Sequence, residues 1–311
     1  MNTFHLAVLD VGGTKAQAAV FDTSGNILAA SREPGGTPLE HGIEACMERF
    51  GGQLERLIAR VGTPIEALYV SLATVEYFGS AMQDYLQTRF PIPHMRVEGD
   101  GPCLISAMLG HRDGVCMICG TGSSLYVRKG DDYYHTGGWG HLIDSCGSGF
   151  VLGRRAIKAV LRAYDKRGEA TMLTEIINKK CGKPIWEDYV HMYQLGRPYI
   201  ASYAGCVFEA RNLGDPVARK IYNVCASDLS DLVWTTRGEL GKPFDIVLGG
   251  GIFANYPEYA ETIRALSPGD VRFMRLDVPP VYGCAVEAMH DIGLETDETF
   301  KENFLKGLAK A

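Results

Sequence analysis

The feature that most constrains the fold is an apolar run at residues 6–9 that ends in Asp10-Val11-Gly12-Gly13-Thr14-Lys15. A second apolar run follows at residues 18–21. The two glycines cut the first run too short for a helix, so the pattern predicts two strands joined by a glycine turn. Such a turn exposes backbone N–H groups, and a phosphate can approach them closely because glycine has no Cβ.

Two more stretches repeat this arrangement. Cys119-Gly120-Thr121-Gly122-Ser123 and Leu248-Gly249-Gly250-Gly251 each follow an apolar run that reads as a strand. One such turn is also compatible with an ordinary hairpin, but three predict a nucleotide whose phosphates meet backbone amides. The sequence lacks G-x-G-x-x-G before a helix and G-x-x-x-x-G-K-[ST], which argues against a Rossmann dinucleotide site and a Walker P-loop.

The order of the predicted elements indicates an α/β fold built twice. Residues 6–109 read as three strands in hairpin order and then alternating helices and strands, which predicts a mixed sheet covered by helices. Residues 114–135 repeat the order strand, glycine turn, strand, turn, strand without side-chain similarity. We expect an N-terminal domain at 1–112 and a C-terminal domain at 113–289, with a helix at about 290–311 packing back on the first. The nucleotide is expected in the cleft between them.

Composition excludes several classes of protein. The 311 residues are 46% hydrophobic, which is ample for two cores, and the net charge is -6. This charge gives no bulk attraction to nucleic acid or to an anionic membrane. The start of the chain lacks the features of a signal peptide, and no apolar run reaches about 18 residues. We therefore expect a cytoplasmic protein.

The nine cysteines fit reduced thiols in that compartment. One C-x-x-C pair, Cys116 and Cys119, lies inside an apolar run that reads as a strand. Residues three apart on a strand point to opposite faces, so these two thiols cannot share a metal ion. The pattern favours core packing over a zinc or redox site.

The motifs resemble a known family. The chain is similar to the actin-like ATPase superfamily of sugar kinases, hexokinases and heat-shock ATPases. Within it, the chain resembles the N-acetylglucosamine kinase members of the BadF/BadG/BcrA/BcrD group. The stretches that carry the resemblance span nearly the whole chain: residues 10–15, 120–123, 137–141, 147–149, 153–154, 214–216 and 280–283.

The resemblance implies that ATP phosphorylates the 6-hydroxyl of an N-acetylated amino sugar. Asp100 matches the family's catalytic acid, and Asp10 would hold Mg²⁺, through water. On the residues alone, Gly99-Asp100-Gly101 is also ideal turn sequence, so Asp100 as a turn acid stays open. The residues implied to bind ATP are those of the three turns: Gly12, Gly13, Thr14, Lys15, Thr121, Gly122, Ser123, Gly249, Gly250 and Gly251.

The sugar side departs from the family pattern. The residues implied to bind sugar are Thr37, Asp100, Gly138, Trp139, Gly140, Asp144 and Ser145. The family usually reads Gly-Asp-Glu-Gly-Ser where this chain has Asp144-Ser145-Cys146-Gly147-Ser148, and Thr37-Pro38 stands where Asn-Pro is common. Trp139 packs on a sugar, supports the binding loop, or is a core tryptophan. His141 is expected to be a hydrogen-bonded loop residue without a chemical role.

We therefore expect an amino-sugar kinase that uses Mg²⁺ with ATP and acts on N-acetylglucosamine or a close relative. N-acetylmuramic acid or glucosamine is the alternative substrate. A non-catalytic sugar or nucleotide sensor and a partner-activating ATPase are the alternatives of another class. The expected partners are a small sugar and ATP, without nucleic acid or membrane, and a homodimer stays open.

Overall fold

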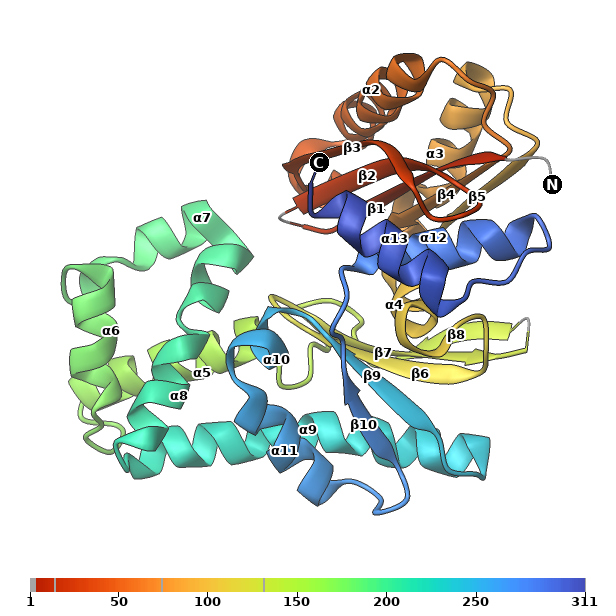
Figure 1. Cartoon of the computed structure of the whole chain (residues 1–311). Helices are drawn as coiled ribbons and strands as arrows, with labels where there is room; N and C mark the ends of the chain where they lie inside the picture. Colours follow the sequence, from red (N-terminus) through yellow and green to blue (C-terminus); the bar gives the residue numbers. More distant parts are fainter. Residues whose placement is uncertain (1–3, 14, 74, 131, 311) are drawn as a thin grey trace. The chain divides into compact units, whose positions relative to one another are not determined.

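The computed structural model describes residues 4–13, 15–73, 75–130 and 132–310 (Figure 1). Thr14, expected at the ATP site, lies outside the described residues. The chain forms two compact units. Unit 1 comprises Met1–Asp113, Arg128–Asp131 and Leu276–Ala311, and unit 2 comprises Gly114–Val127 and Asp132–Arg275.

Unit 1 contains a mixed sheet in the order β3-β2-β1-β4-β5. The first three strands are antiparallel neighbours, and β4 and β5 are added in parallel to β1. This confirms the prediction of a hairpin followed by crossover strands. The bounds are β1 His5–Val11, β2 Lys15–Asp22, β3 Ile27–Pro34, β4 Ala67–Leu72 and β5 His94–Glu98.

Helices cover both faces of this sheet (Figure 1). α2 and α3 pack on one face, where Leu9 joins a core cluster with Phe50 and Leu54. α13 packs on the other face, where the Phe304 ring meets the Phe21 ring edge-on at 5.2 Å. The helices of the unit are α1 Pro38–His41, α2 Ile43–Val61, α3 Val75–Arg89, α4 Asp100–Leu109, α12 Pro280–Asp291 and α13 Glu298–Leu308.

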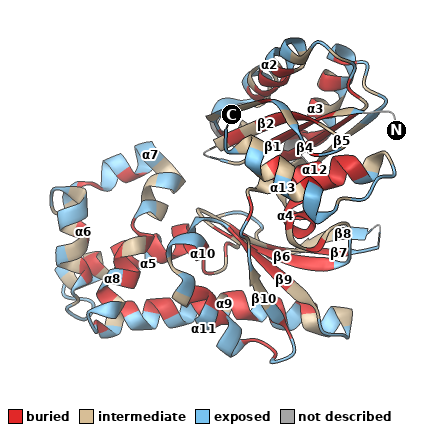
Figure 2. Cartoon of the chain, in the orientation of Figure 1, coloured by how far each residue is buried: buried red, intermediate tan, exposed pale blue. Residues whose placement is uncertain are grey.

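α12 belongs to unit 1 because it packs tightly on α4. A Cβ on Gly283 would lie 1.7 Å from the Cys103 carbonyl oxygen, so only glycine allows this approach. Figure 2 shows α12 as almost wholly buried. The second boundary between the units therefore falls at Leu276, earlier than the expected residue 289.

Unit 2 repeats the sheet of unit 1. Its strand order, β10-β9-β6-β7-β8, places the first strand of the half in the middle, as in unit 1, and both β9 and β10 are parallel additions. The duplicated architecture inferred from the strand order is thus confirmed. The bounds are β6 Gly114–Cys119, β7 Ser123–Lys129, β8 Asp132–Thr136, β9 Asp245–Gly249 and β10 Arg272–Arg275.

The rest of unit 2 is mainly helical. α9 begins as the sequence predicted, with Pro216 at its first position and the Asp215 carboxylate accepting a hydrogen bond from the Ala218 N–H at 2.7 Å. The helices are α5 Gly149–Tyr164, α6 Leu173–Cys181, α7 Tyr189–Ser202, α8 Ala204–Asn212, α9 Pro216–Leu240, α10 Gly251–Asn255 and α11 Pro257–Leu266, with a 3₁₀ turn at Ile185–Glu187.

Cys116 and Cys119 are both fully buried in β6, which confirms the prediction that they pack in the core. Within the described parts of the chain, no helix is both long enough and apolar enough to cross a membrane.

Candidate active site

The first glycine turn lies at the carboxyl end of β1 in unit 1. The Gly12 N–H donates to the Lys15 carbonyl at 2.9 Å, and the Gly36 N–H donates to the Gly12 carbonyl at 3.1 Å. The second bond brings the segment that follows β3 against the turn. Thr37, the next residue, is buried and extended, so this expected sugar ligand lies beside the turn.

Asp10 is buried at the end of β1, paired in register with Ser71 of the parallel strand β4. Burial raises the pKa of Asp10 to about 6, opposed by the charge of Lys15 and by a hydrogen bond with Ser71. Burial also lowers the pKa of Lys15. Burial disfavours the ionised form of this carboxylate, and a nearby cation would stabilise that form. Its oxygen donors suit Mg²⁺.

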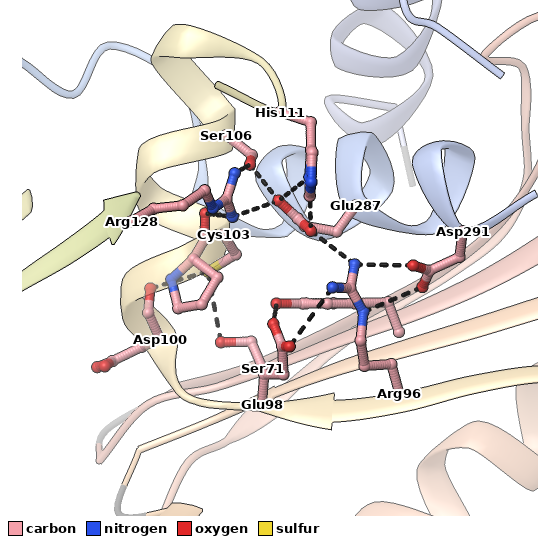
Figure 3. A network of polar contacts seen from close by, with 12 residues as sticks. Ser71, Arg96, Glu98, Asp100, Cys103, Ser106, His111, Arg128, Glu287 and Asp291 are labelled. Atoms are coloured by element: carbon pink, nitrogen blue, oxygen red, sulfur yellow. Dashed lines mark hydrogen bonds and ion pairs between the residues drawn. The ribbon is translucent and has the colours of Figure 1, made fainter. Parts of the chain in front are cut away.

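Asp100 is the first residue of α4, with Gly99 as the N-cap in extended conformation. The alternative prediction that Asp100 is a turn acid is therefore wrong, because a helix begins here instead of a turn. Its side chain points away from the polar contacts behind it (Figure 3). Its carbonyl oxygen accepts a hydrogen bond from the Cys103 thiol at 3.1 Å.

A buried polar network holds α4 against α12 (Figure 3). At its centre is Glu287 of α12, whose side chain is fully buried. Its carboxylate lies 2.6 Å from Arg96 Nη2 and 2.6 Å from Arg128 Nη2, and it accepts a hydrogen bond from the Ser106 hydroxyl of α4. Burial alone would raise the pKa of Glu287, but Arg128, Ser106 and Arg96 together hold it below its usual range.

The sequence alone does not predict this network. The available signal was one acid inside the apolar run 281–289, since a buried carboxylate requires partners. Its partners lie on β5, α4 and β7, up to 191 residues away, so no local pattern identifies them. The network holds in place the helix on which Asp100 stands.

In unit 2 the second and third glycine turns meet at the start of α5. The N–H groups of Gly149 and Phe150 donate to the carbonyls of Gly120 and Thr121, at 2.8 and 3.0 Å. Gly250 has φ +97°, and a Cβ there would lie 2.4 Å from the Cys119 carbonyl oxygen. Two stretches far apart in sequence, both expected to bind ATP, are thus brought together.

The loop that follows β8 holds the expected sugar residues of unit 2. Gly138 and Gly140 have φ of +80° and +97°, which only glycine adopts readily. Trp139 between them is 65% exposed, with its ring 4.5 Å from that of His135. The alternative of a core tryptophan is therefore wrong. The exposed ring is available to a ligand.

The acid of this loop is held in place by its neighbours. The Asp144 N–H donates to the Gly140 carbonyl at 2.9 Å, and its carboxylate accepts from the Cys146 thiol at 2.9 Å. Ser145 is buried, and its hydroxyl lies 2.8 Å from that of Ser148, the N-cap of α5. The loop is thereby tied to the helix that supports the second glycine turn.

One cationic residue near the second glycine turn is also not among the residues that the sequence motifs identify. Arg197 Nη2 lies 3.8 Å from the position a Cβ would take on Gly122. The signal was Gly196-Arg197-Pro198, where glycine and proline interrupt a helical pattern around a charge.

The chain matches a family of known proteins over most of its length. The sequence pattern of the BadF/BadG/BcrA/BcrD ATPase family matches residues 9–286 of this chain.

Two of the relatives that match by sequence are named as amino-sugar kinases. The N-acetylmuramic acid/N-acetylglucosamine kinase of Clostridium acetobutylicum is 30% identical over 209 residues, which cover 65% of this chain and 66% of that relative. The N-acetyl-D-glucosamine kinase of Dictyostelium discoideum is 31% identical over 157 residues, 48% of this chain and 49% of the relative. The matched part is thus less than two thirds of either relative.

The fold is shared with solved structures. The crystal structure of the "Putative N-acetylglucosamine Kinase" from Chromobacterium violaceum superposes with a TM-score of 0.72. It is 20% identical, and the match covers 90% of this chain and 97% of that one. At this identity the likeness shows the fold, two α/β units with mixed sheets flanked by helices.

Proposed function

The chain belongs to the BadF/BadG/BcrA/BcrD ATPase family, and from that premise we propose that it is an ATP-dependent amino-sugar kinase. The reaction would transfer the γ-phosphoryl group of ATP to the 6-hydroxyl of N-acetylglucosamine or a close relative. The observation that carries the proposal is the meeting of the second and third glycine turns at the start of α5. Turns of this kind offer backbone amides to phosphates without side chains in the way.

Phosphoryl transfer requires mainly positioning and charge neutralisation. We assign the phosphates of ATP to the turns at residues 12–15, 121–123 and 249–251. Asp10 would hold Mg²⁺ through water, and the ion would supply the positive charge that bridges the phosphate oxygens. The buried, partly compensated carboxylate of Asp10 fits this role.

Asp100 is the proposed catalytic acid. Its carboxylate would accept the proton of the sugar hydroxyl or align that hydroxyl with the γ-phosphate. Its place at the first position of α4, a helix fixed by the Glu287 network, supports this assignment because a positioned base needs a rigid support.

We propose that Thr37, the loop around Trp139, and Asp144 bind the sugar. Trp139 offers an exposed ring, and Asp144 offers a carboxylate held in a fixed turn. A carboxylate binds sugar hydroxyls through charge-assisted hydrogen bonds. N-acetylmuramic acid is the second candidate substrate, because Ser145 and Cys146 leave fewer negative charges here than the family pattern does.

An ADP-release assay tests the proposal. The purified protein is given Mg·ATP with N-acetylglucosamine, N-acetylmuramic acid, glucosamine or glucose, or with no sugar. We expect ADP only when an amino sugar is present, and a product phosphorylated at the 6-position by NMR. ADP without sugar would instead identify a partner-activating ATPase. Binding of sugar or nucleotide by calorimetry without any ADP would identify a sensor.

A further inference from the structure

Two glycines determine where Arg197 lies in unit 2. α7 is broken at Gly196, which has φ +64° and ψ -147°, so the chain changes direction one residue before the arginine. Beyond the break, α7 approaches α5 so closely that a Cβ on Gly153 would lie 2.0 Å from the Ile200 carbonyl oxygen. The break and the close approach together direct Arg197 to the start of α5.

At that position the guanidinium lies against the second glycine turn. Arg197 Nη2 and Ser145 Oγ lie 3.8 and 4.0 Å from the same point, the Cβ position of Gly122. Arg197 is half-buried. Among the described residues, no carboxylate lies within 4.0 Å of its guanidinium. A half-buried arginine without such a partner beside a glycine turn has unused hydrogen-bond donors.

Two more basic groups contact Phe150, whose N–H donates to the Thr121 carbonyl of the second glycine turn. The guanidinium of Arg154 lies 5.4 Å above the Phe150 ring, and the His141 ring meets that phenylalanine edge-on at 5.1 Å. The pKa of His141 is lowered by burial, by Arg197 and by Arg154. Both arginines therefore act electrostatically on His141. We call Arg154, Arg197 and His141 the basic cluster.

The backbone donors at the start of α5 are already used within unit 2. The N–H groups of Gly149 and Phe150 donate to the second glycine turn, and the Val151 N–H donates to the Ser148 hydroxyl at 3.3 Å. An anion that reaches this place would therefore be met by the side chains of the basic cluster. The planar guanidinium of arginine can bind two oxygens of a phosphate or carboxylate at once.

We propose that the basic cluster is an anion-binding site, with Arg197 as its principal donor, for an anionic oxygen group of the reactants. The group is either a phosphate of the nucleotide or a carboxylate carried by the sugar. This inference rests on the proposed kinase function and adds a binding residue to it. Either group could reach Arg197. Gly122 belongs to a turn assigned to the ATP phosphates, and Ser145 of the sugar loop lies beside the same glycine.

Binding measurements test the site without relying on turnover. Calorimetry with ADP and with inorganic phosphate compares the wild type with Arg197→Ala, Arg197→Lys and Arg155→Ala. Arg155 is the matched control, because it is the neighbouring arginine on α5 but lies 3.9 Å from the Asp228 carboxylate. If a phosphate is the ligand, we expect affinity to fall by roughly 10- to 100-fold in Arg197→Ala. Arg197→Lys should recover part of it, and Arg155→Ala should match the wild type.

NMR titration of His141 reports the cluster directly, with His141→Gln used to assign its signal. In Arg197→Ala the pKa of His141 should rise, since one of the charges that lower it is gone. Arg155→Ala should leave that pKa unchanged.

The two ligand sources are separated by kinetics. A phosphate ligand predicts that Arg197→Ala lowers kcat/KM equally for N-acetylglucosamine and N-acetylmuramic acid. A sugar carboxylate predicts a loss confined to N-acetylmuramic acid, with ADP affinity unchanged. If Arg197→Ala matches Arg155→Ala in ADP affinity, His141 titration and sugar preference, the site does not exist. If the wild type phosphorylates no sugar, the kinase proposal fails, while the ADP, phosphate and His141 measurements still decide the anion site.

Discussion

The three acids of the candidate site, Asp10, Asp100 and Asp144, occupy different surroundings. Asp10 is buried, and its pKa is raised to about 6 by burial. Asp100 stands half-buried at the first position of a helix, and Asp144 lies in a loop with a thiol as hydrogen-bond donor. These environments favour a separate role for each acid: metal, proton and sugar hydroxyl. The sequence could supply the residues but not the surroundings, because desolvation depends on the packing of distant elements.

Asp100→Asn should abolish sugar phosphorylation and leave ADP affinity within a few fold. The amide keeps the shape of the side chain but cannot accept the proton, and the expected loss of kcat is on the order of 10²–10⁴. The measurements are steady-state kinetics and ADP calorimetry on a variant whose circular dichroism matches the wild type. Near-normal turnover would reduce Asp100 to a first-turn acid that only favours the helix dipole.

Glu287→Gln should destabilise unit 1, because it leaves the guanidinium groups of Arg96 and Arg128 beside a neutral amide. Removing one partner of a buried ion pair costs about 3–5 kcal/mol. Urea unfolding at neutral pH, followed by circular dichroism, measures the difference. Asp165→Asn is the control, since this acid pairs with Arg167 on the surface of unit 2. If Glu287→Gln and Asp165→Asn have the same free energy of unfolding, the assigned role of Glu287 is wrong.

The same variant has a defined pH dependence. The pKa of Glu287 is lower in the folded protein than its usual value of 4.5, so its contribution to stability is fully present above pH 4.5. That contribution is lost as the pH falls through the lower folded pKa. The difference between wild type and Glu287→Gln should therefore shrink below pH 4.5. A difference that stays constant at acid pH would show that the charge of Glu287 is not responsible.

At the scale of elements, the strands were predicted better than the helices beside the site. The two apolar runs within residues 6–21 and the glycine turn between them identify β1 and β2, because both signals are local. α4 was missed, since Gly99-Asp100-Gly101 is turn sequence and the helix is held by α12 from the other end of the chain. The break in α7 could be predicted, because helical spacing stops at residue 193 and resumes at residue 200, with Gly196 and Pro198 between them.

Gly122→Val tests the second glycine turn. The structure gives Gly122 an ordinary φ, and a Cβ would sit at normal contact distance from Arg197 and Ser145. The variant should therefore fold, but its branched side chain would fill the space beside the turn where we place a phosphate. We expect a clear loss of ADP affinity by calorimetry, with Gly122→Ala intermediate. Unchanged affinity in Gly122→Val would remove this turn from the nucleotide site.

At the scale of the whole chain, the duplication could be predicted because strand order is visible in the sequence. The first boundary could be predicted as well, at residue 112 against the observed 113, because the strand order restarts there. The second boundary could not, because unit 1 combines residues from both ends of the chain. α12 joins it through contacts such as Gly283 against Cys103, which are 180 residues apart in sequence and leave no local signal. Apart from Arg128–Asp131, the chain of unit 2 is therefore inserted within that of unit 1.

This topology predicts which segments of the chain fold alone. Residues 114–275 form one continuous segment that holds the whole second sheet and its own core, so this fragment should fold alone and unfold cooperatively. Arg128 would lose Glu287, but in the fragment it is free to become solvated.

Residues 1–113 alone should not fold, because without residues 276–311 one face of the first sheet stays uncovered and Arg96 loses Glu287 and Asp291. Joining 1–113 to 276–311 through a flexible linker should restore a cooperative transition. Thermal melts followed by circular dichroism decide between these outcomes, and cooperative unfolding of 1–113 by itself would refute the assignment of α12 and α13 to unit 1.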